Sequence, residues 1–265
     1  MGVVVDSHVH SRFSCDATNS IDEMCEAAIE KGVSYLTFLE HYDLHKDDMG
    51  YRFLKMDSYL QALDEAALKY SGRLTVLKGL EFGEPHRHPS ELEAVQDMGF
   101  DVIAGSVHWI GDRFIGDPTL SNDDISKVYN DYWREVSEVI DLDGVDVLAH
   151  LDIPKRYLRC EPDCTEGLGD LICKIAESNK VLEVNTSSLA KGLYQPMPSF
   201  DSLRMYAEAG GYRLSFGSDA HTTDRVADQF DWVTRGIRSL CRGSLGVVVK
   251  RQFVAISTDR DGDLR

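Results

Sequence analysis

Two short motifs in this 265-residue chain pair residues that commonly bind metals. "DSHVH" near the amino terminus contains His8 and His10, and "GSDAH" contains Asp219 and His221. In an extended strand, residues two apart lie on the same face, so each pair can hold a metal ion from one side. A single histidine at a strand end is more often an ordinary hydrogen-bonded residue, so the argument depends on how many such residues come together.

Other histidines and carboxylates follow apolar, strand-like runs in the same way. His41 ends "YLTFLEH", Glu81 lies in "GLEFGE", His108 ends "GSVH", His150 ends "DVLAH", and Asp16 follows the first motif. Six of the nine histidines therefore fall at the carboxyl ends of runs that read as strands. The full set of candidate metal ligands is His8, His10, Asp16, His41, Glu81, His108, His150, Asp219 and His221.

These candidate ligands are too many for one zinc ion, which typically takes four. They suit two or three divalent ions that share bridging carboxylates. Mixed imidazole and carboxylate ligands fit zinc, iron or manganese and argue against magnesium or calcium alone. Such a cluster can bind phosphoryl oxygens and activate water. The pattern therefore predicts metal-assisted hydrolysis, most plausibly of a phosphate ester.

The three remaining histidines are expected to lie outside the cluster. His86 and His88 repeat the one-residue spacing, but the prolines around them in "EPHRHP" indicate a loop. His45 follows His41 by four residues and can share a helical face with it. For these three histidines, contact with substrate is less favoured than a position outside the site, and metal binding is less favoured still.

Short apolar runs alternate with segments of helical period, which indicates β-α units and a parallel sheet. Seven strands are expected near Val3–His8, Tyr35–Glu40, Leu74–Glu81, Asp101–Ser106, Asp146–His150, Val181–Asn185 and Arg213–Gly217, and a last β-rich run, Gly246–Ile256, closes or flanks the sheet. Ser20 and Glu23 form a capping box before one helix. In a barrel of such units the carboxyl ends of the strands meet at one mouth, where active sites form.

Composition narrows the class of partner. A net charge of −17 disfavours nucleic acid, since the phosphate backbone would be repelled. No apolar run is long enough to span a membrane, and the amino terminus does not resemble a secretory signal. Cys160 and Cys164 can form a zinc or redox pair, but the six irregularly spaced cysteines favour free thiols and a cytoplasmic location. We expect one domain over residues 1–265 with a frayed tail from residue 256.

The assembled motifs resemble the polymerase and histidinol phosphatase (PHP) family, and especially its histidinol-phosphatase branch. They occur in the order "DSHVHSRFSCD", "LEHYD", "GLEFGE", "GSVHW", "AHLDIPKRY", "EVNTSS" and "GSDAH". The resemblance runs from about Val3 to about His221. It implies an α/β fold, a distorted (β/α)7 TIM-like barrel, and a metal-dependent phosphomonoesterase that hydrolyses L-histidinol phosphate in histidine biosynthesis.

The resemblance also implies how the ligands divide among metals. It assigns His8, His10, Glu81 and Asp219 to one ion, Glu81, His108 and His150 to a second, and Asp16, His41 and His221 to a third. Glu81, Asp219 and His221 are the candidate catalytic residues. The implied mechanism is attack on phosphorus by a hydroxide that bridges two metals, without a covalent phospho-enzyme. Asp6 is interpreted as a residue that supports the ligands from behind.

Basic side chains are expected to complete the phosphate pocket. Arg156 is the first choice, with Lys155 beside it. Relatives often carry an "SGLR"-like stretch after the sixth strand, whereas this chain has Ser187-Ser188-Leu189-Ala190-Lys191. Lys191 can replace that cation, but an ammonium lacks the planar fork of a guanidinium. This departure bears on the identity of the small phosphorylated substrate more than on hydrolysis.

Three other functions remain open from the sequence. The protein can be a related phosphoesterase for another small phosphate, such as a nucleotide. It can be an amidohydrolase-type barrel, although Asp16, His41 and the early position of Glu81 speak against this. The third is a metal-dependent sensor or accessory module without turnover, which the complete ligand set disfavours. The sequence does not determine the native metal or the oligomeric state.

Overall fold

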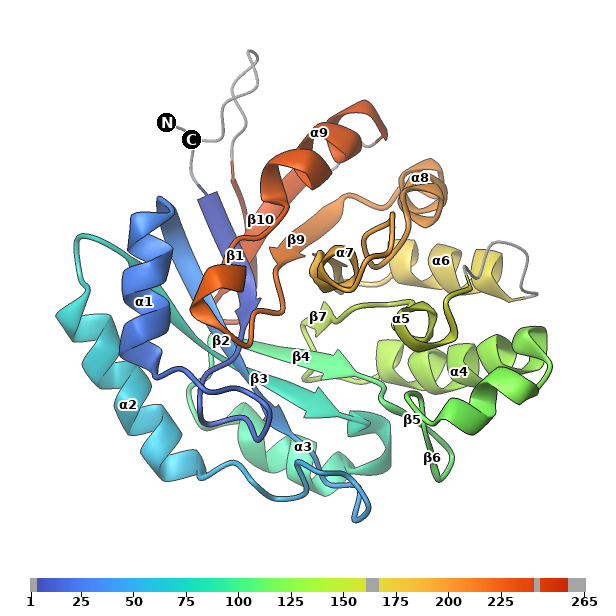
Figure 1. Ribbon diagram of the computed structural model, residues 1–265, viewed down its shortest axis with the longest axis horizontal. Coiled ribbons are helices and arrows are strands. Elements are labelled where there is room, and N and C mark those ends of the chain that lie inside the picture. The colour runs from blue at the N-terminus through green and yellow to red at the C-terminus, as the bar shows by residue number, and fades with distance from the viewer. Residues whose placement is uncertain (1–3, 161–166, 241–243, 257–265) are drawn as a thin grey trace.

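The computed structural model describes residues 4–160, 167–240 and 244–256 (Figure 1). Its strands are β1 (Val4–Val9), β2 (Val33–Tyr42), β3 (Thr75–Gly83), β4 (Val102–Ser106), β5 (Trp109–Ile110), β6 (Arg113–Phe114), β7 (Val147–Leu148), β8 (Val181–Asn185), β9 (Arg213–Gly217), β10 (Ser244–Val249) and β11 (Gln252–Ala255). Its α-helices are α1 (Ile21–Glu30), α2 (Met56–Lys69), α3 (Pro89–Gln96), α4 (Ile125–Ile140), α5 (Pro154–Leu158), α6 (Leu168–Glu177), α7 (Ser187–Ala190), α8 (Phe200–Glu208) and α9 (Phe230–Leu240). Short 3₁₀ turns cover Pro85–Arg87, Pro118–Asn122 and Thr223–Arg225.

Seven parallel strands form the main sheet in the order β1-β2-β3-β4-β7-β8-β9. Past the end of β9 the chain returns to β1, where Val9 bridges Ala220 and the His10 amide donates to the Ala220 carbonyl at 2.8 Å. This contact brings the first and last of the seven strands together. The α/β class and the distorted barrel predicted from the sequence are confirmed.

Alternation along the strands separates two apolar layers. Leu36, Phe38 and Leu80 belong to the large core cluster that includes residues of α1, α2 and α4. Leu39 and Val102 belong instead to a smaller cluster that joins β2, β4, β7, β8 and β10. Since side chains two apart share a face, a strand that buries one set against helices presents the other set to the interior of the ring.

Helices cover the outside of the ring of strands (Figure 1). The predicted capping box is present at the start of α1, where the Ser20 hydroxyl accepts from the Glu23 amide and the Glu23 carboxylate accepts from the Ser20 amide. On α4, Tyr129, Tyr132 and Trp133 are buried in the core. Such one-sided burial is the usual reason that an amphipathic segment is helical in a folded domain.

The strands β10 and β11 extend the sheet beyond β9. β10 runs parallel to β9, with Ser244 opposite Arg213, and β11 returns antiparallel to β10. Val247 packs with Val5 and Leu77, so β10 joins the amino-terminal parts of β1 and β3. The prediction that the last β-rich run closes or flanks the sheet is therefore confirmed, with the run divided into two strands.

Further predictions concern membrane spans, the cysteine pair, the carboxyl-terminal tail and the number of domains. Among the described helices, none combines the length and apolarity needed to cross a bilayer. Cys160 is exposed, whereas Cys164 and the predicted frayed tail after Ile256 lie outside the described residues. The single-domain reading stays a prediction.

Candidate metal centre

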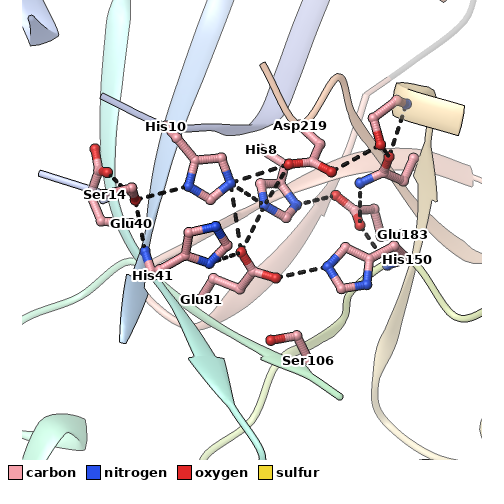
Figure 2. Close-up of polar contacts among 12 residues, drawn as sticks. His8, His10, Ser14, Glu40, His41, Glu81, Ser106, His150, Glu183 and Asp219 are labelled. Atoms are coloured by element: carbon pink, nitrogen blue, oxygen red, sulfur yellow. Dashed lines mark hydrogen bonds and ion pairs between the residues drawn. The ribbon is translucent and has the colours of Figure 1, made fainter. Parts of the chain in front are cut away.

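All nine candidate ligands come from the ends of strands or the loops that follow them. Their side chains converge at one end of the ring of strands, as Figure 2 shows for six of them. Three groups each bring three potential ligand atoms within 4.8 Å of one another. The groups are His8, His10 and Asp219; Glu81, His108 and His150; and His10, His41 and His221.

Glu81 lies at the centre of these groups. Its Oε1 is 2.8 Å from His150 Nε2 and 3.5 Å from His108 Nε2. Its Oε2 is 3.0 Å from His41 Nδ1 and 3.3 Å from His8 Nε2. The two carboxylate oxygens therefore face different sets of imidazoles, which is the arrangement that a bridging carboxylate requires.

His10 is shared between two groups. Its Nε2 lies 3.0 Å from His8 Nε2 and 3.3 Å from Asp219 Oδ1, and its ring stacks on His41 and His221 with centroids 4.3 Å and 4.2 Å away. His8 and His10 thus share a face, as their spacing predicted. The third group differs from the sequence prediction in containing His10 where Asp16 was expected.

Asp16 nevertheless lies beside that group. Its Oδ2 is 3.1 Å from His221 Nε2 and its Oδ1 is 3.7 Å from His41 Nε2. With 38% of its side chain exposed, Asp16 is more open to solvent than Glu81, of which 1% is exposed. Asp16 therefore stands at the solvent-facing edge of the cluster.

The backbone at Asp219 corrects one expectation. Asp219 and His221 were expected on one face if the chain stayed extended, but β9 ends at Gly217 and Asp219 has a φ of 53°. The two side chains still meet, with His221 Nδ1 3.6 Å from Asp219 Oδ1, because the chain turns there. His150 also has a positive φ, of 26°. Unfavourable backbone conformations of this kind concentrate at functional sites.

Glu183 on β8 contacts two of the candidate ligands and was not singled out from the sequence. Its Oε1 is 2.6 Å from His8 Nδ1, and its Oε2 accepts from the His150 amide at 2.7 Å. Gly217 makes room for it, since a Cβ there would overlap Glu183 Oε1 and lie 2.6 Å from His8 Cβ. Hydrogen bonds of this kind orient metal-binding imidazoles.

Three further carboxylates that the sequence analysis did not assign to the site surround the ligands. Glu40 is fully buried on β2, Glu84 accepts from the His108 and Trp109 amides, and Asp43 Oδ1 lies 3.9 Å from His108 Nδ1. Their position in the sequence could have identified them, because each lies within three residues of His41 or Glu81.

Asp6 also supports the site, through the backbone. Its carboxylate accepts from the Ser218 amide at 2.9 Å, from the Ser218 hydroxyl at 2.6 Å and from the Ala227 amide at 2.8 Å. Burial raises the pKa of Asp6 to about 6, against the lowering effect of these hydrogen bonds. Asp6 thereby fixes the segment that leads into Asp219.

Electrostatics within the cluster favour ligand-ready carboxylates. Burial acts to raise the pKa of Glu81, but His41 and His8 outweigh it and hold that pKa well below its usual range. Burial lowers the pKa of His10, and the nearby His221 and His41 lower it further. An ionised carboxylate and a neutral imidazole are the forms that bind metals.

Two buried polar atoms also indicate that these residues can bind divalent ions. Glu81 Oε2 and His41 Nδ1 are buried and 3.0 Å apart, yet within the described part of the chain neither atom has a partner in hydrogen-bond geometry. Buried polar atoms are usually satisfied, so these two atoms are suited to binding an ion. Imidazole and carboxylate donors suit zinc, manganese and iron.

A pocket of about 410 Å³ opens onto the cluster. Its walls include the ligand residues Asp16, His41, His108, His150, Asp219 and His221, the acids Asp43, Asp47 and Asp48, and Trp109, Phe114, Arg156 and Tyr157. A neighbouring pocket of about 380 Å³ shares Asp16, Arg156, Asp219 and His221, and also contains Lys191.

The three predicted substrate-binding cations have different positions. Arg156 lines both pockets, with Nη1 3.3 Å from Asp219 Oδ2 and 3.4 Å from Ser187 Oγ. Lys191 lines only the second pocket. Lys155 is not brought to either pocket: its side chain is buried, 2.9 Å from Asp152 Oδ2 and 2.6 Å from the Pro196 carbonyl. As the second residue of α5, it points inward where Arg156 points to the site.

The three histidines set aside in the sequence analysis lie outside the three ligand groups among the described residues. His86 Nε2 is 2.7 Å from Glu135 Oε2, and His88 stacks on Phe82. His45 stacks on Trp109, a wall of the larger pocket, with centroids 3.8 Å apart.

Comparison with known proteins gives the same result as the motifs. The protein-family model of the PHP domain matches residues 6–187 of the sequence. The chain belongs to the PHP family. Two of its relatives are a probable histidinol-phosphatase of Deinococcus radiodurans, 28% identical over 89% of this chain and 93% of the relative, and the histidinol-phosphatase of Lactococcus lactis, 26% identical over 87% of each chain.

Solved structures of PHP proteins share its fold. The histidinol phosphate phosphatase of Lactococcus lactis, crystallised with zinc, L-histidinol and phosphate, superimposes with a TM-score of 0.82 at 21% identity, covering 96% of this chain and 100% of the other. A putative histidinol phosphatase from Listeria monocytogenes gives a TM-score of 0.73 at 18% identity, covering 86% and 98%. The PHP protein described here is thus a metal-dependent phosphoesterase of the histidinol-phosphatase-like type, and its buried histidine and carboxylate groups indicate several metal ions.

Proposed function

We propose that this PHP protein hydrolyses L-histidinol phosphate to L-histidinol and inorganic phosphate. The observation that carries the proposal is the pocket beside the cluster, whose walls combine candidate metal ligands and Arg156 with acidic and aromatic side chains. Relatives that cover most of the chain are named histidinol-phosphatases, and one was crystallised with L-histidinol and phosphate. We assign histidine biosynthesis as the setting on the same ground.

The nine ligand residues are proposed to hold two or three divalent ions, drawn from zinc, iron and manganese. Bound ions supply Lewis acidity toward the phosphoryl oxygens and a water of lowered pKa. The chain's own part is to fix their positions: Glu81 presents one oxygen to His150 and the other to His41. Asp219 and His221 close the same site from the segment that follows the last strand of the ring.

Arg156 is proposed to orient the phosphoryl group. Its guanidinium lies at the boundary of both pockets, beside Asp219 and Ser187. Its planar fork can donate two parallel hydrogen bonds to phosphate oxygens, which an ammonium cannot do. Lys191, which lines only the second pocket, can add a diffuse positive charge.

The acidic and aromatic wall of the larger pocket suits a cationic, planar leaving group. Asp43, Asp47 and Asp48 contribute carboxylates there, and Trp109 contributes an aromatic face. The Trp109 Nε1–H donates to Asp48 Oδ2 at 2.8 Å, which fixes the indole and the acid together. An amine next to these carboxylates, and an imidazole against the aromatic wall, would both be stabilised.

Steady-state kinetics on the manganese- or zinc-loaded enzyme tests the proposal. The panel contains L-histidinol phosphate, a nucleoside monophosphate, a sugar phosphate and p-nitrophenyl phosphate. We expect kcat/KM for L-histidinol phosphate to exceed the others at least tenfold. Equal or greater values for the nucleoside monophosphate would transfer the assignment to a related phosphoesterase.

Single substitutions of two pocket acids test whether they recognise the leaving group. Asp47→Asn and Asp48→Asn should raise KM for L-histidinol phosphate while leaving p-nitrophenyl phosphate hydrolysis close to that of the unsubstituted enzyme. Asp57→Asn, in the first turn of α2 and outside the pocket, is a matched control. If both substrates respond alike, the acids support the fold and do not recognise the leaving group.

A further inference from the structure

Ser14 lies where two candidate ligands meet a buried carboxylate. Its Oγ is 2.6 Å from Glu40 Oε2, 3.1 Å from His10 Nδ1 and 3.0 Å from the His41 amide nitrogen (Figure 2). Ser14 and Glu40 are 1% and 0% exposed, so water does not compete for these contacts. Ser14 is neither a candidate ligand nor part of either pocket's wall.

Counting protons assigns a direction to each bond. A serine hydroxyl has one proton to donate and two lone pairs to accept with. The His41 amide must donate, so it uses one lone pair. The Glu40 carboxylate is an acceptor when ionised, and its Oε1 already accepts from the Ser11 amide at 2.8 Å and the Ser11 hydroxyl at 2.6 Å. When Glu40 is ionised, the Ser14 proton therefore goes to Glu40 Oε2.

Only one role then remains for His10 Nδ1. The second lone pair of Ser14 Oγ can accept a proton but cannot supply one, so His10 must carry its proton on Nδ1. Its Nε2 is left with a lone pair, and Nε2 is the atom that lies 3.3 Å from Asp219 Oδ1 and 3.0 Å from His8 Nε2.

We propose that Ser14, held by Glu40, is a positioning residue that fixes His10 in the Nδ1–H tautomer and so directs Nε2 into the metal cluster. Because the Ser14 hydroxyl also accepts from the His41 amide, it holds the first loop against the end of β2. His10 belongs to two of the three ligand groups, so one hydroxyl affects both. The inference depends on metal binding and holds for any phosphate ester.

The position of Glu40 in β2 explains why this arrangement is available. Residues 36, 38 and 40 alternate with 37, 39 and 41, and His41 faces Glu81 while Glu40 faces the loop that contains Ser11 and Ser14. Adjacent residues of one strand thus serve the cluster in two ways: His41 directly, and Glu40 through a hydroxyl.

Metal affinity of substituted proteins tests the proposal. Ser14→Ala should weaken binding of at least one zinc ion by about 10- to 100-fold, the usual effect of removing a group that orients a ligand. Ser14→Thr keeps the hydroxyl and should recover most of the affinity. Ser11→Ala is the matched control, because its hydroxyl also binds Glu40 but makes no hydrogen bond to a candidate ligand in the described part of the chain. Affinity is measured by competition with a chromogenic chelator.

A second measurement reports the tautomer of His10 directly. Nitrogen-15 NMR of the zinc-loaded protein should show the His10 imidazole protonated at Nδ1, with its signal perturbed in Ser14→Ala and unchanged in Ser11→Ala. Equal zinc affinity in Ser14→Ala and Ser11→Ala, or a His10 protonated at Nε2, would overturn the inference. Failure of the unsubstituted protein to bind any zinc would instead count against the proposed function.

Discussion

The carboxylate of Glu183 lies 2.6 Å from Nδ1 of His8, although 175 residues separate the two in sequence. The same carboxylate accepts from the His150 amide. One buried acid on β8 therefore fixes the ring of one candidate ligand and the backbone of another. Burial acts to lower the pKa of His8, but Glu183 and Glu81 raise it well above its usual range, so metal binding there should release a proton.

Glu183→Gln should weaken metal binding by about 10- to 100-fold. The amide keeps the size of the side chain but removes the charge that orients His8. Titration of the metal-stripped protein with zinc, followed by calorimetry, gives the affinity. Glu177→Gln, at the exposed end of α6, is the control. Unchanged affinity in Glu183→Gln would show that His8 needs no orienting carboxylate.

Gly217→Ala should reduce both stability and metal binding. A Cβ at this position would overlap Glu183 Oε1 and approach His8 Cβ to 2.6 Å. Overpacking of this kind typically costs about 1–3 kcal/mol of unfolding free energy. Urea denaturation measures the change. Gly169→Ala in α6, where a Cβ would meet only Met205 among the described residues, at 3.9 Å, should be neutral or stabilising.

Arg156 substitutions should affect phosphate recognition in a graded way. Arg156→Ala is expected to lower kcat/KM by about 100-fold, since a bidentate charged hydrogen bond is lost. Arg156→Lys should recover part of this loss, because it restores the charge without the planar fork. Arg204→Ala, on the exposed side of α8, serves as the control. A full recovery by lysine would contradict a bidentate contact.

Glu135 lies outside the cluster and allows a test of how the free energy of unfolding depends on pH. Burial acts to raise its pKa, but His86, Arg87 and the Gly111 amide lower it to about 2. A lowered folded-state pKa stabilises the protein above the unfolded value of about 4.5, and this contribution is lost as pH falls toward 2. Glu135→Gln should therefore cost about 1–2 kcal/mol at pH 7, after discounting for partial exposure. The difference from the unsubstituted protein should shrink between pH 5 and pH 3. A constant difference in urea unfolding across this range would refute the assignment.

Strand positions were predictable because the sequence alternates so regularly. Val181–Asn185 and Arg213–Gly217 have the predicted bounds, and the other five main strands differ by a few residues at their ends. The ligand positions followed from that count, since each lies at or after the end of a strand. Confirmation of metal binding at these nine residues awaits the experiments above.

The supporting residues were harder to predict. Glu183 and Glu40 look like ordinary strand residues, and their importance comes from contacts with residues far along the chain. Lys155 and Arg156 are neighbours in sequence, and only the rotation of α5 decides which one reaches the pocket. The left-handed turn at Asp219 has no marker, because the residue there is not glycine.

The contact between Val9 and Ala220 lies within the candidate metal centre itself. His8 and His10 are on one side of this junction, and Asp219 and His221 are on the other. An ion bound between them would act as a cross-link that ties the start of the chain to residues more than 200 positions later. Closing so long a loop has a large entropic cost, and metal coordination would offset it. Loss of the ions should therefore open the barrel along this junction before it disturbs the strands opposite.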